Sequence, residues 1–172
     1  MEIDIRKYIR DIPDFPKEGV LFRDITPALI EPEVFEEICG VIYRRYRDRG
    51  IDKIAAIESR GFIFGSVLAY TLKTGLVPVR KEGKLPYETV SESYELEYSE
   101  ATLEIHTDAI EDGEKVLIID DLLATGGTAA ATCKLIEDLG GSIEELCFLI
   151  ELSALRGRDL LDGRNIFSII TY

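Results

Sequence analysis

The sequence predicts an α/β protein with a doubly wound, mainly parallel twisted sheet. Short runs rich in β-branched residues alternate along the chain with segments of helical periodicity, which is the pattern of repeated βαβ units. The run 116–119 contains no polar residue, as expected for a central strand covered by helices on both faces. The composition is that of a globular protein, with 46% hydrophobic and 31% charged residues. A length of 172 residues predicts one domain over 1–172.

The individual elements are predicted in chain order. Two helices come first, at 3–11 and 32–49, with a structured loop at 12–27 between them. Strands follow at 53–57, 77–80, 116–119, 145–151 and 167–171, and helices at 62–73, 128–139 and 155–161. Residues 81–108 break this pattern, because alternating polar and apolar residues at 94–98 and 101–107 predict an antiparallel β-hairpin. Long excursions of this kind are usually functional, which predicts a lid over about 81–108.

The charge and the cysteines restrict the partners and the compartment. Asp and Glu number 33 against 20 Lys and Arg, so the net charge of −13 repels nucleic acid and anionic membranes. We therefore expect no nucleic-acid or membrane partner, and any polyanionic ligand must bind at a local site. No signal core and no apolar run of roughly 20 residues is found. Cys39, Cys133 and Cys147 have no C-x-x-C spacing, which predicts free thiols in a reducing cytoplasm.

A single histidine limits the metal chemistry. Because His106 is the only histidine in the sequence, a metal site built from several histidines is excluded, and we predict no direct protein site for a metal. The residue lies on the polar face of its strand, so we expect it to be solvated rather than catalytic.

The most informative segment follows the strand at 116–119. It combines two carboxylates, a glycine turn and two hydroxyls, and leads into a helix: Asp120, Asp121, Ala124, Thr125, Gly126, Gly127 and Thr128. Ligands of open α/β sheets bind beyond the carboxyl ends of the strands, where the amide groups of a glycine turn and a helix N-terminus bind phosphate. No lysine follows the glycines and no G-x-G occurs, which excludes a P-loop and a dinucleotide fingerprint. Two carboxylates beside a monophosphate suit ribose hydroxyls or a hydrated Mg²⁺, and ribose 5-phosphate provides both groups.

This segment resembles the phosphoribosyl diphosphate signature of the type I phosphoribosyltransferases. Four further motifs resemble the adenine phosphoribosyltransferase family in order and spacing: FPKEGVLFRDITP at 15–27, ESRGF at 58–62, RKEGKLP at 80–86 and LEY at 96–98. The resemblance covers nearly the whole chain. It implies purine salvage, in which phosphoribose passes from 5-phosphoribosyl 1-diphosphate to adenine and gives AMP and pyrophosphate. It also implies a homodimer and Mg²⁺ that arrives with the diphosphate.

A second anion site is predicted at the turn after the strand at 53–57. This turn precedes a helix, and by resemblance it is the pyrophosphate loop, which often contains a non-proline cis peptide. Basic residues at the end of the next strand would neutralise the charge that grows on the departing diphosphate. The predicted pyrophosphate-binding set is Ser59, Arg60, Arg80, Lys81 and Lys84. Arg60 is also assigned to the catalytic residues.

The resemblance assigns the remaining site residues to the lid and to an N-terminal hood over about 1–30. The catalytic Glu97, next to Tyr98 on the lid, is implied to handle the N7 or N9 proton of adenine. The adenine-binding set is implied to be Leu21 and Arg23, through their backbone groups, and Phe22 and Leu122, through packing on the base. Closure of the lid would exclude water from the reactive sugar.

Taken singly, the motifs also fit ordinary roles. The acids could be solvated strand ends, Arg60 a surface residue beside a helix cap, the basic cluster a solvated turn, Glu97 a hydrophilic strand position and Phe22 a core residue. Three rival functions follow: transfer to a 6-oxo purine, a non-enzymatic sensor of phosphoribosyl nucleotides, and hydrolysis of ribose phosphates. The acidic net charge counts against a sensor, and so does the use of the whole chain for one domain, which leaves no added DNA-binding domain. A hydrolase needs a general base that activates water, and the sequence offers none better than Glu97.

Overall fold

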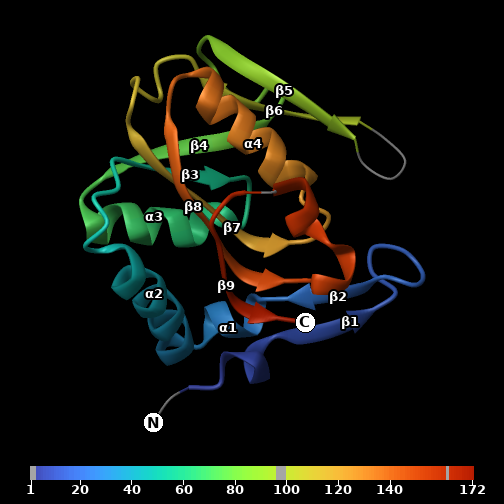
Figure 1. Ribbon diagram of the computed structural model, residues 1–172. Helices are drawn as coiled ribbons and strands as arrows, with labels where there is room; N and C mark the ends of the chain where they lie inside the picture. The colour runs from blue at the N-terminus through green and yellow to red at the C-terminus, as the bar shows by residue number, and fades with distance from the viewer. Residues whose placement is uncertain (1–2, 96–99, 162) are drawn as a thin grey trace. The chain divides into compact units, whose positions relative to one another are not determined.

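The computed structural model describes residues 3–95, 100–161 and 163–172. The chain divides into two compact units, Met1–Arg45 and Tyr46–Tyr172, which are described in turn (Figure 1). The prediction of one domain over 1–172 is not tested by this division and stays a prediction.

The first unit contains a two-stranded antiparallel ribbon. A 3₁₀ turn, η1 (Ile5–Tyr8), precedes β1 (Arg10–Pro13), which pairs with β2 (Leu21–Asp24). The helices α1 (Thr26–Ile30) and α2 (Pro32–Tyr46) follow. The predicted helix at 3–11 was therefore wrong beyond η1, and the predicted loop at 12–27 contains β2. Local periodicity did not identify this ribbon, because its two strands are short and the turn at 14–20 separates them.

The second unit is built on a seven-stranded sheet with the order β5-β6-β4-β3-β7-β8-β9. Five strands are parallel: β3 (Lys53–Ile57), β4 (Gly75–Lys81), β7 (Lys115–Leu123), β8 (Ser142–Glu151) and β9 (Ile166–Thr171). The hairpin of β5 (Thr89–Glu95) and β6 (Glu100–His106) adds antiparallel to β4 (Figure 1). The predicted fold class, a mainly parallel doubly wound sheet with a β-hairpin, is confirmed.

The helices α3 (Gly61–Leu72) and α4 (Gly127–Asp138) cover opposite faces of this sheet. Alternate strand residues point to alternate faces. Ala56 and Ile119 lie against Gly65 of α3, whereas Ala55 and Ile118 belong to the buried cluster that packs against α4. The run 116–119 is at most 1% exposed, which confirms the predicted central strand.

Several predicted boundaries changed, and one predicted helix is of another type. β7 continues to Leu123, because β8 pairs with it as far as that residue, so the two acids lie inside the end of the strand. The hairpin begins at Thr89, five residues earlier than predicted, and residues 96–98 of its predicted first strand lie outside the described residues. The predicted helix at 155–161 is two 3₁₀ segments, η2 (Ser153–Leu155) and η3 (Gly157–Leu161), separated by Arg156 with a φ of 54°.

The histidine departs from expectation, whereas the cysteines form no disulfide, as predicted. His106 is half-buried rather than solvated: its Nε2 atom is buried and has no hydrogen-bond partner among the described residues, and Tyr87 meets its ring edge to face at 5.9 Å. Cys133 and Cys147 are buried, Cys39 is half-buried, and none of the three forms a disulfide within the described residues. Burial raises the pKa of Cys39 and that of Cys133 to about 11, so both thiols are protonated at neutral pH.

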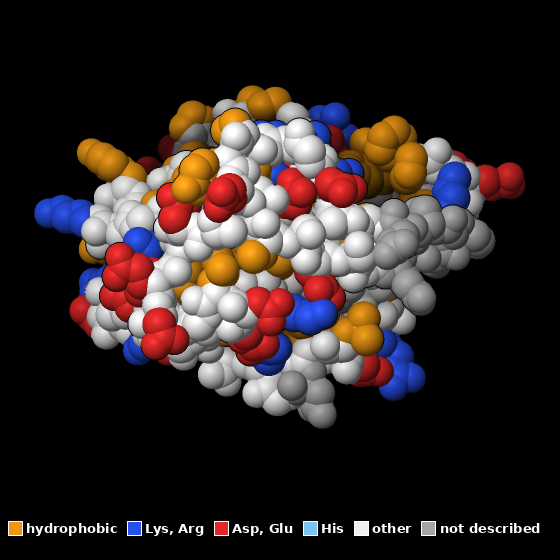
Figure 2. All heavy atoms as spheres, turned by 90° about the horizontal axis from the view of Figure 1, so that it is seen from above, with side chains coloured by type: hydrophobic (Ala, Val, Ile, Leu, Met, Phe, Trp, Pro, Cys, Tyr) orange, Lys and Arg blue, Asp and Glu red, His pale blue; other side chains and the backbone are white. Residues whose placement is uncertain are grey.

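Surface charge follows the composition. Acidic side chains lie in several groups on the face shown in Figure 2, with basic side chains beside some of them. Within the described parts of the chain, no helix has both the length and the apolar character that crossing a membrane requires.

Candidate active site

The sheet topology of the second unit places a crevice beyond the carboxyl ends of β3 and β7. These two strands are neighbours in the sheet. After β3 the chain continues to β4 on one side of the pair, and after β7 it continues to β8 on the other side. Open α/β sheets bind ligands at such a switch point. The turn at 58–61 follows β3, and the segment 120–128 contains the end of β7 and the start of α4. Both predicted anion-binding motifs therefore come together at this edge.

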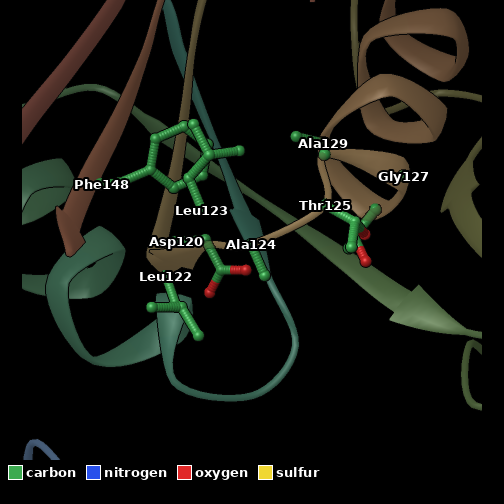
Figure 3. Close-up of a pocket in the computed structure, with 10 residues that line it drawn as sticks. Asp120, Leu122, Leu123, Ala124, Thr125, Gly127, Ala129 and Phe148 are labelled. Carbon is green, nitrogen blue, oxygen red and sulfur yellow. The ribbon is translucent and has the colours of Figure 1, made fainter. Parts of the chain in front are cut away.

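The glycine loop, defined as residues 124–128, lines a cavity at the N-terminus of α4. Gly126 precedes the helix with a φ of 90°, a conformation that side-chain-bearing residues rarely adopt. The first amide groups of α4 have no acceptor within the helix, so they face the cavity as anion donors. Figure 3 shows the Asp120 carboxylate beside the loop and Thr125 at the start of the helix. All the predicted phosphoribosyl-binding residues except Asp121 are among those that line this cavity: Asp120, Leu122, Leu123, Ala124, Thr125, Gly126, Gly127, Thr128, Ala129 and Phe148.

A second cavity adjoins the first. It is lined by residues from both predicted anion sites and from the hairpin: Glu58, Ser59, Arg60, Lys81, Tyr94, Leu103, Asp120, Asp121 and Thr128. Asp120 and Thr128 line both cavities, so the two are adjacent. The arrangement suits a ligand with a phosphate at one end and a second anionic group at the other.

An arginine balances the acidic pair at the shared wall. Arg60 donates from Nε to Oδ2 of Asp121 at 2.5 Å, and the Asp121 side chain is only 5% exposed. Burial raises the pKa of Asp120 well above its usual range, and the neighbouring charge of Asp121 raises it further. The backbone amide of Asp121 donates to Asp120 at 2.8 Å and partly opposes this shift. Burial and the neighbouring carboxylate thus oppose the negative charge of Asp120, while the guanidinium of Arg60 lies against Asp121.

Glu58 holds the basic cluster in place, a role that the sequence did not reveal. Its carboxylate accepts hydrogen bonds from Arg80 Nε at 3.2 Å, the Lys81 amide at 3.1 Å and Lys84 Nζ at 2.5 Å. Burial would raise the pKa of Glu58, but these donors outweigh it and the pKa is lowered. The Glu58–Ser59 peptide bond is cis, as the resemblance implied for this turn. The basic groups of Arg80 and Lys84 and the backbone of Lys81 are therefore joined at one carboxylate beside the second cavity.

Tyr94 is a second residue that sequence reasoning missed. Its hydroxyl on β5 accepts a hydrogen bond from Thr128 Oγ1 at 3.1 Å, which ties the hairpin to the glycine loop. Lys134 of α4 adds an ion pair to Glu92 at 2.7 Å. The polar–apolar alternation placed Tyr94 on a strand, but the helix against which that strand packs lies far along the chain, so no local pattern pairs the two.

The remaining predicted residues belong to the first unit, to the wall of the first cavity or to the parts of the chain that the structure does not describe. Glu97 and Tyr98 are not among the described residues, so their roles stay predictions. Within the first unit, Leu21 is 45% exposed, Phe22 packs edge to face on Phe15 at 5.1 Å, and Arg23 pairs with Asp11. The adenine-binding roles of 21–23 and of Leu122 also stay predictions. Among the described residues, no group of three or more His, Cys, Asp or Glu is placed to hold a metal ion.

Known proteins match this chain along nearly its whole length. Residues 28–170 match the phosphoribosyl transferase domain family. The adenine phosphoribosyltransferase of Thermosipho melanesiensis is 55% identical over 170 residues, which cover 99% of this chain and 97% of that protein. The crystal structure of adenine phosphoribosyltransferase from Thermoanaerobacter pseudethanolicus is similar with a TM-score of 0.95 and 52% identity, covering 98% of each chain. The Saccharomyces cerevisiae adenine phosphoribosyltransferase, in complex with adenine and an imino-altritol bisphosphate, has a TM-score of 0.91, 39% identity and 96% coverage of each chain.

Proposed function

Because this chain belongs to the phosphoribosyltransferase family, and within it to the adenine phosphoribosyltransferases, we propose that it transfers phosphoribose from 5-phosphoribosyl 1-diphosphate to adenine. The products are AMP and pyrophosphate, and the activity is one of purine salvage. The observation that carries this proposal is the pair of adjoining cavities that share Asp120 and Thr128.

We assign the parts of the substrate to the two cavities. The amide groups of the glycine loop and the hydroxyls of Thr125 and Thr128 bind the 5-phosphate. Asp120 and Asp121 accept hydrogen bonds from the vicinal ribose hydroxyls. The diphosphate lies in the second cavity, which the turn at 58–61 and Lys81 line. The order of these sites matches the order of groups in the substrate: the monophosphate site binds the 5-phosphate, the pair of carboxylates binds the ribose, and the basic wall binds the diphosphate.

The reaction needs charge stabilisation more than proton transfer. The transition state resembles an oxocarbenium ion, and the departing diphosphate gains negative charge as the glycosidic bond breaks. Arg60 is held at the cavity by Asp121, and the cluster on Glu58 keeps Arg80 and Lys84 nearby, so these cations are positioned before the reaction begins. We assign the handling of the proton at N7 or N9 of adenine to Glu97.

The donor set also fits Mg²⁺ delivered with the substrate. Diphosphate oxygens, water and the two neighbouring carboxylates are oxygen ligands of the kind that Mg²⁺ prefers. The ion supplies neutralisation of the diphosphate charge, and it is held mainly by substrate oxygens and water, with few direct protein ligands. The same proposal includes a cytoplasmic homodimer, in keeping with the free thiols and with the resemblance.

Adenine specificity is assigned to the hood of about 1–30. The yeast relative binds adenine in its solved complex, which supports an adenine site in this chain. Backbone groups of Leu21 and Arg23 then offer a donor and an acceptor to the base edge, while Phe22 and Leu122 pack on its faces. A 6-oxo purine reverses the hydrogen bonding at that edge, so this backbone pattern rejects it.

A direct assay tests the proposal. The chain is incubated with 5-phosphoribosyl 1-diphosphate, Mg²⁺ and adenine, hypoxanthine or guanine, and nucleotide and pyrophosphate are measured together. We expect fast AMP formation, little reaction of the 6-oxo purines, and no pyrophosphate release without a base. Preferred formation of IMP or GMP would show that the substrate is another base, and release of pyrophosphate without a base would show that the protein is a hydrolase. Tight binding of 5-phosphoribosyl 1-diphosphate without transfer to any base overturns the enzyme in favour of a sensor.

A further inference from the structure

The glycine loop rests on the backbone of the C-terminal 3₁₀ segment η3. A Cβ atom added to Gly157 would lie 2.3 Å from the carbonyl oxygen of Ala124, and one added to Gly126 would lie 2.3 Å from the carbonyl oxygen of Gly157. Real Cβ atoms essentially never approach another atom within 3.0 Å. The two backbones are therefore in direct contact, with no side chain between them, and residue 157 limits where the loop can lie.

The segment η3 is itself anchored at two other points. Arg158 donates to both carboxylate oxygens of Glu151, at 2.6 and 2.7 Å, and Ser168 Oγ donates to the same carboxylate at 2.8 Å. Glu151 ends β8 and is only 6% exposed. Leu161, at the other end of η3, lies in the core at 1% exposure. The segment is thus fixed to the sheet on one side and to the glycine loop on the other.

The ionised state of Glu151 supports this anchoring. Hydrogen bonds from Arg158 lower the pKa of Glu151, and they outweigh the effect of burial, which raises it. A planar guanidinium that binds both oxygens of one carboxylate fixes orientation as well as distance. A lysine at the same position would keep the charge but would lose that fixed orientation.

We propose that Gly157 and Arg158 are positioning residues, which hold the glycine loop where it binds the 5-phosphate of the substrate. The proposal rests on the proposed function, because it assigns the glycine loop to that phosphate. Neither residue lines the two cavities, so their effect passes through the loop backbone. The predicted consequence is selective: 5-phosphate binding depends on η3, whereas pyrophosphate binding at the turn after β3 does not.

The test compares Gly157→Ala with Gly75→Ala. Neither glycine has a positive φ, so alanine fits the backbone conformation at both. At Gly75 the added methyl meets only the flexible Lys53 side chain, at 2.8 Å, whereas at Gly157 it meets fixed backbone. Binding of ribose 5-phosphate and of inorganic pyrophosphate is measured by calorimetry for both variants. Steady-state kinetics give kcat and the Michaelis constant for the phosphoribosyl donor.

A loop displaced by about 1 Å loses roughly ten- to a hundredfold in binding and positioning. We therefore expect Gly157→Ala to raise both the Kd of ribose 5-phosphate and the Michaelis constant for the phosphoribosyl donor by about that factor. The Kd of pyrophosphate should stay within about twofold, and Gly75→Ala should change neither. Arg158→Lys, which adds no clash, should act in the same direction with a smaller effect, and it provides the test if Gly157→Ala does not fold.

Two results overturn the proposal. Unchanged binding of ribose 5-phosphate in both the Gly157 and the Arg158 variants, in an enzyme that makes AMP, refutes the role of η3 alone. Equal weakening of ribose 5-phosphate and pyrophosphate shows a general structural role instead of a positioning one. If the unaltered chain neither binds ribose 5-phosphate nor makes AMP, the proposed function itself fails.

Discussion

Replacing Arg60 by alanine should weaken the fold by a moderate amount. The change removes the cation that lies 2.5 Å from Asp121 and leaves a carboxylate that is only 5% exposed. Breaking a fully buried pair costs about 3–5 kcal/mol, and an exposed pair contributes about 0–1 kcal/mol. Because Arg60 is 39% exposed and water reaches its side of the pair, we expect a loss of about 1–2 kcal/mol in the free energy of unfolding.

The same substitution should affect the reaction much more strongly. Arg60 faces the cavity assigned to the diphosphate, where negative charge grows in the transition state. Removing one preorganised donor from such a position usually lowers kcat by about 10²–10³. Arg60→Ala should therefore lower kcat by that factor, while adenine binding changes little.

Urea unfolding and steady-state release of pyrophosphate measure the two effects. Arg44→Ala is the matched control, because Arg44 is 57% exposed and pairs with Glu37 on α2. A double-mutant cycle with Asp121→Asn isolates the pair, and the double variant should lose about 1 kcal/mol less than the sum of the single variants. Additive losses, or a kcat within about threefold of the unaltered chain, would refute the role assigned to Arg60.

The hydrogen bonds and acids around the two cavities give three more predictions. Tyr94→Phe removes the hydrogen bond to Thr128, a contact of about 0.5–1.5 kcal/mol, so kcat/KM for the phosphoribosyl donor should fall about two- to tenfold, and unchanged kinetics would contradict this. The folded-state pKa of Glu58 is lowered, so the ionised Glu58 stabilises the fold above the ordinary carboxyl pKa, and this stabilisation is lost as pH falls through the folded-state pKa. Glu58→Gln should therefore make the melting temperature fall less steeply with decreasing pH below about pH 5. An unchanged decrease would count against this role of Glu58. The folded-state pKa of Asp120 is raised, so the fold loses stability as pH rises above the ordinary carboxyl pKa and Asp120 has to ionise. Asp120→Asn should therefore raise the melting temperature near neutral pH but not below about pH 4, and it should weaken ribose binding. A lower melting temperature at neutral pH would contradict this.

The core strands were predictable because their signal is local. Residues 54–57 and 116–119 are apolar throughout, and burial on both faces requires that composition whatever the neighbouring strands are. The ribbon of β1 and β2 was missed because its strands are short and none of their residues is fully buried, so they stabilise each other by pairing rather than by burial. The extension of β7 to Leu123 was missed for a related reason, since β8 supplies its partner.

The candidate site divides in the same way. Residues that meet a ligand through backbone geometry, such as Gly126 and Gly127, are visible in the sequence because glycine and small hydroxyl residues are needed at fixed spacing. Residues that hold these groups in place are not, because their partners lie far along the chain. Glu58 reaches Lys84, and Tyr94 reaches Thr128, across strand and helix boundaries that no local pattern encodes.

The acidic pair shows why such supporting residues are needed. Asp120 lies next to Asp121 in a desolvated wall, an arrangement that opposes folding in the free protein. Arg60 offsets part of that cost from the neighbouring turn, and Gly61 allows that turn to approach β7, because a Cβ there would lie 2.7 Å from the carbonyl oxygen of Ile119. Under the proposed function, ribose hydroxyls satisfy the same carboxylates when the substrate binds. The local instability is thus relieved by the ligand, which is how a strained polar site converts its cost in folding into affinity.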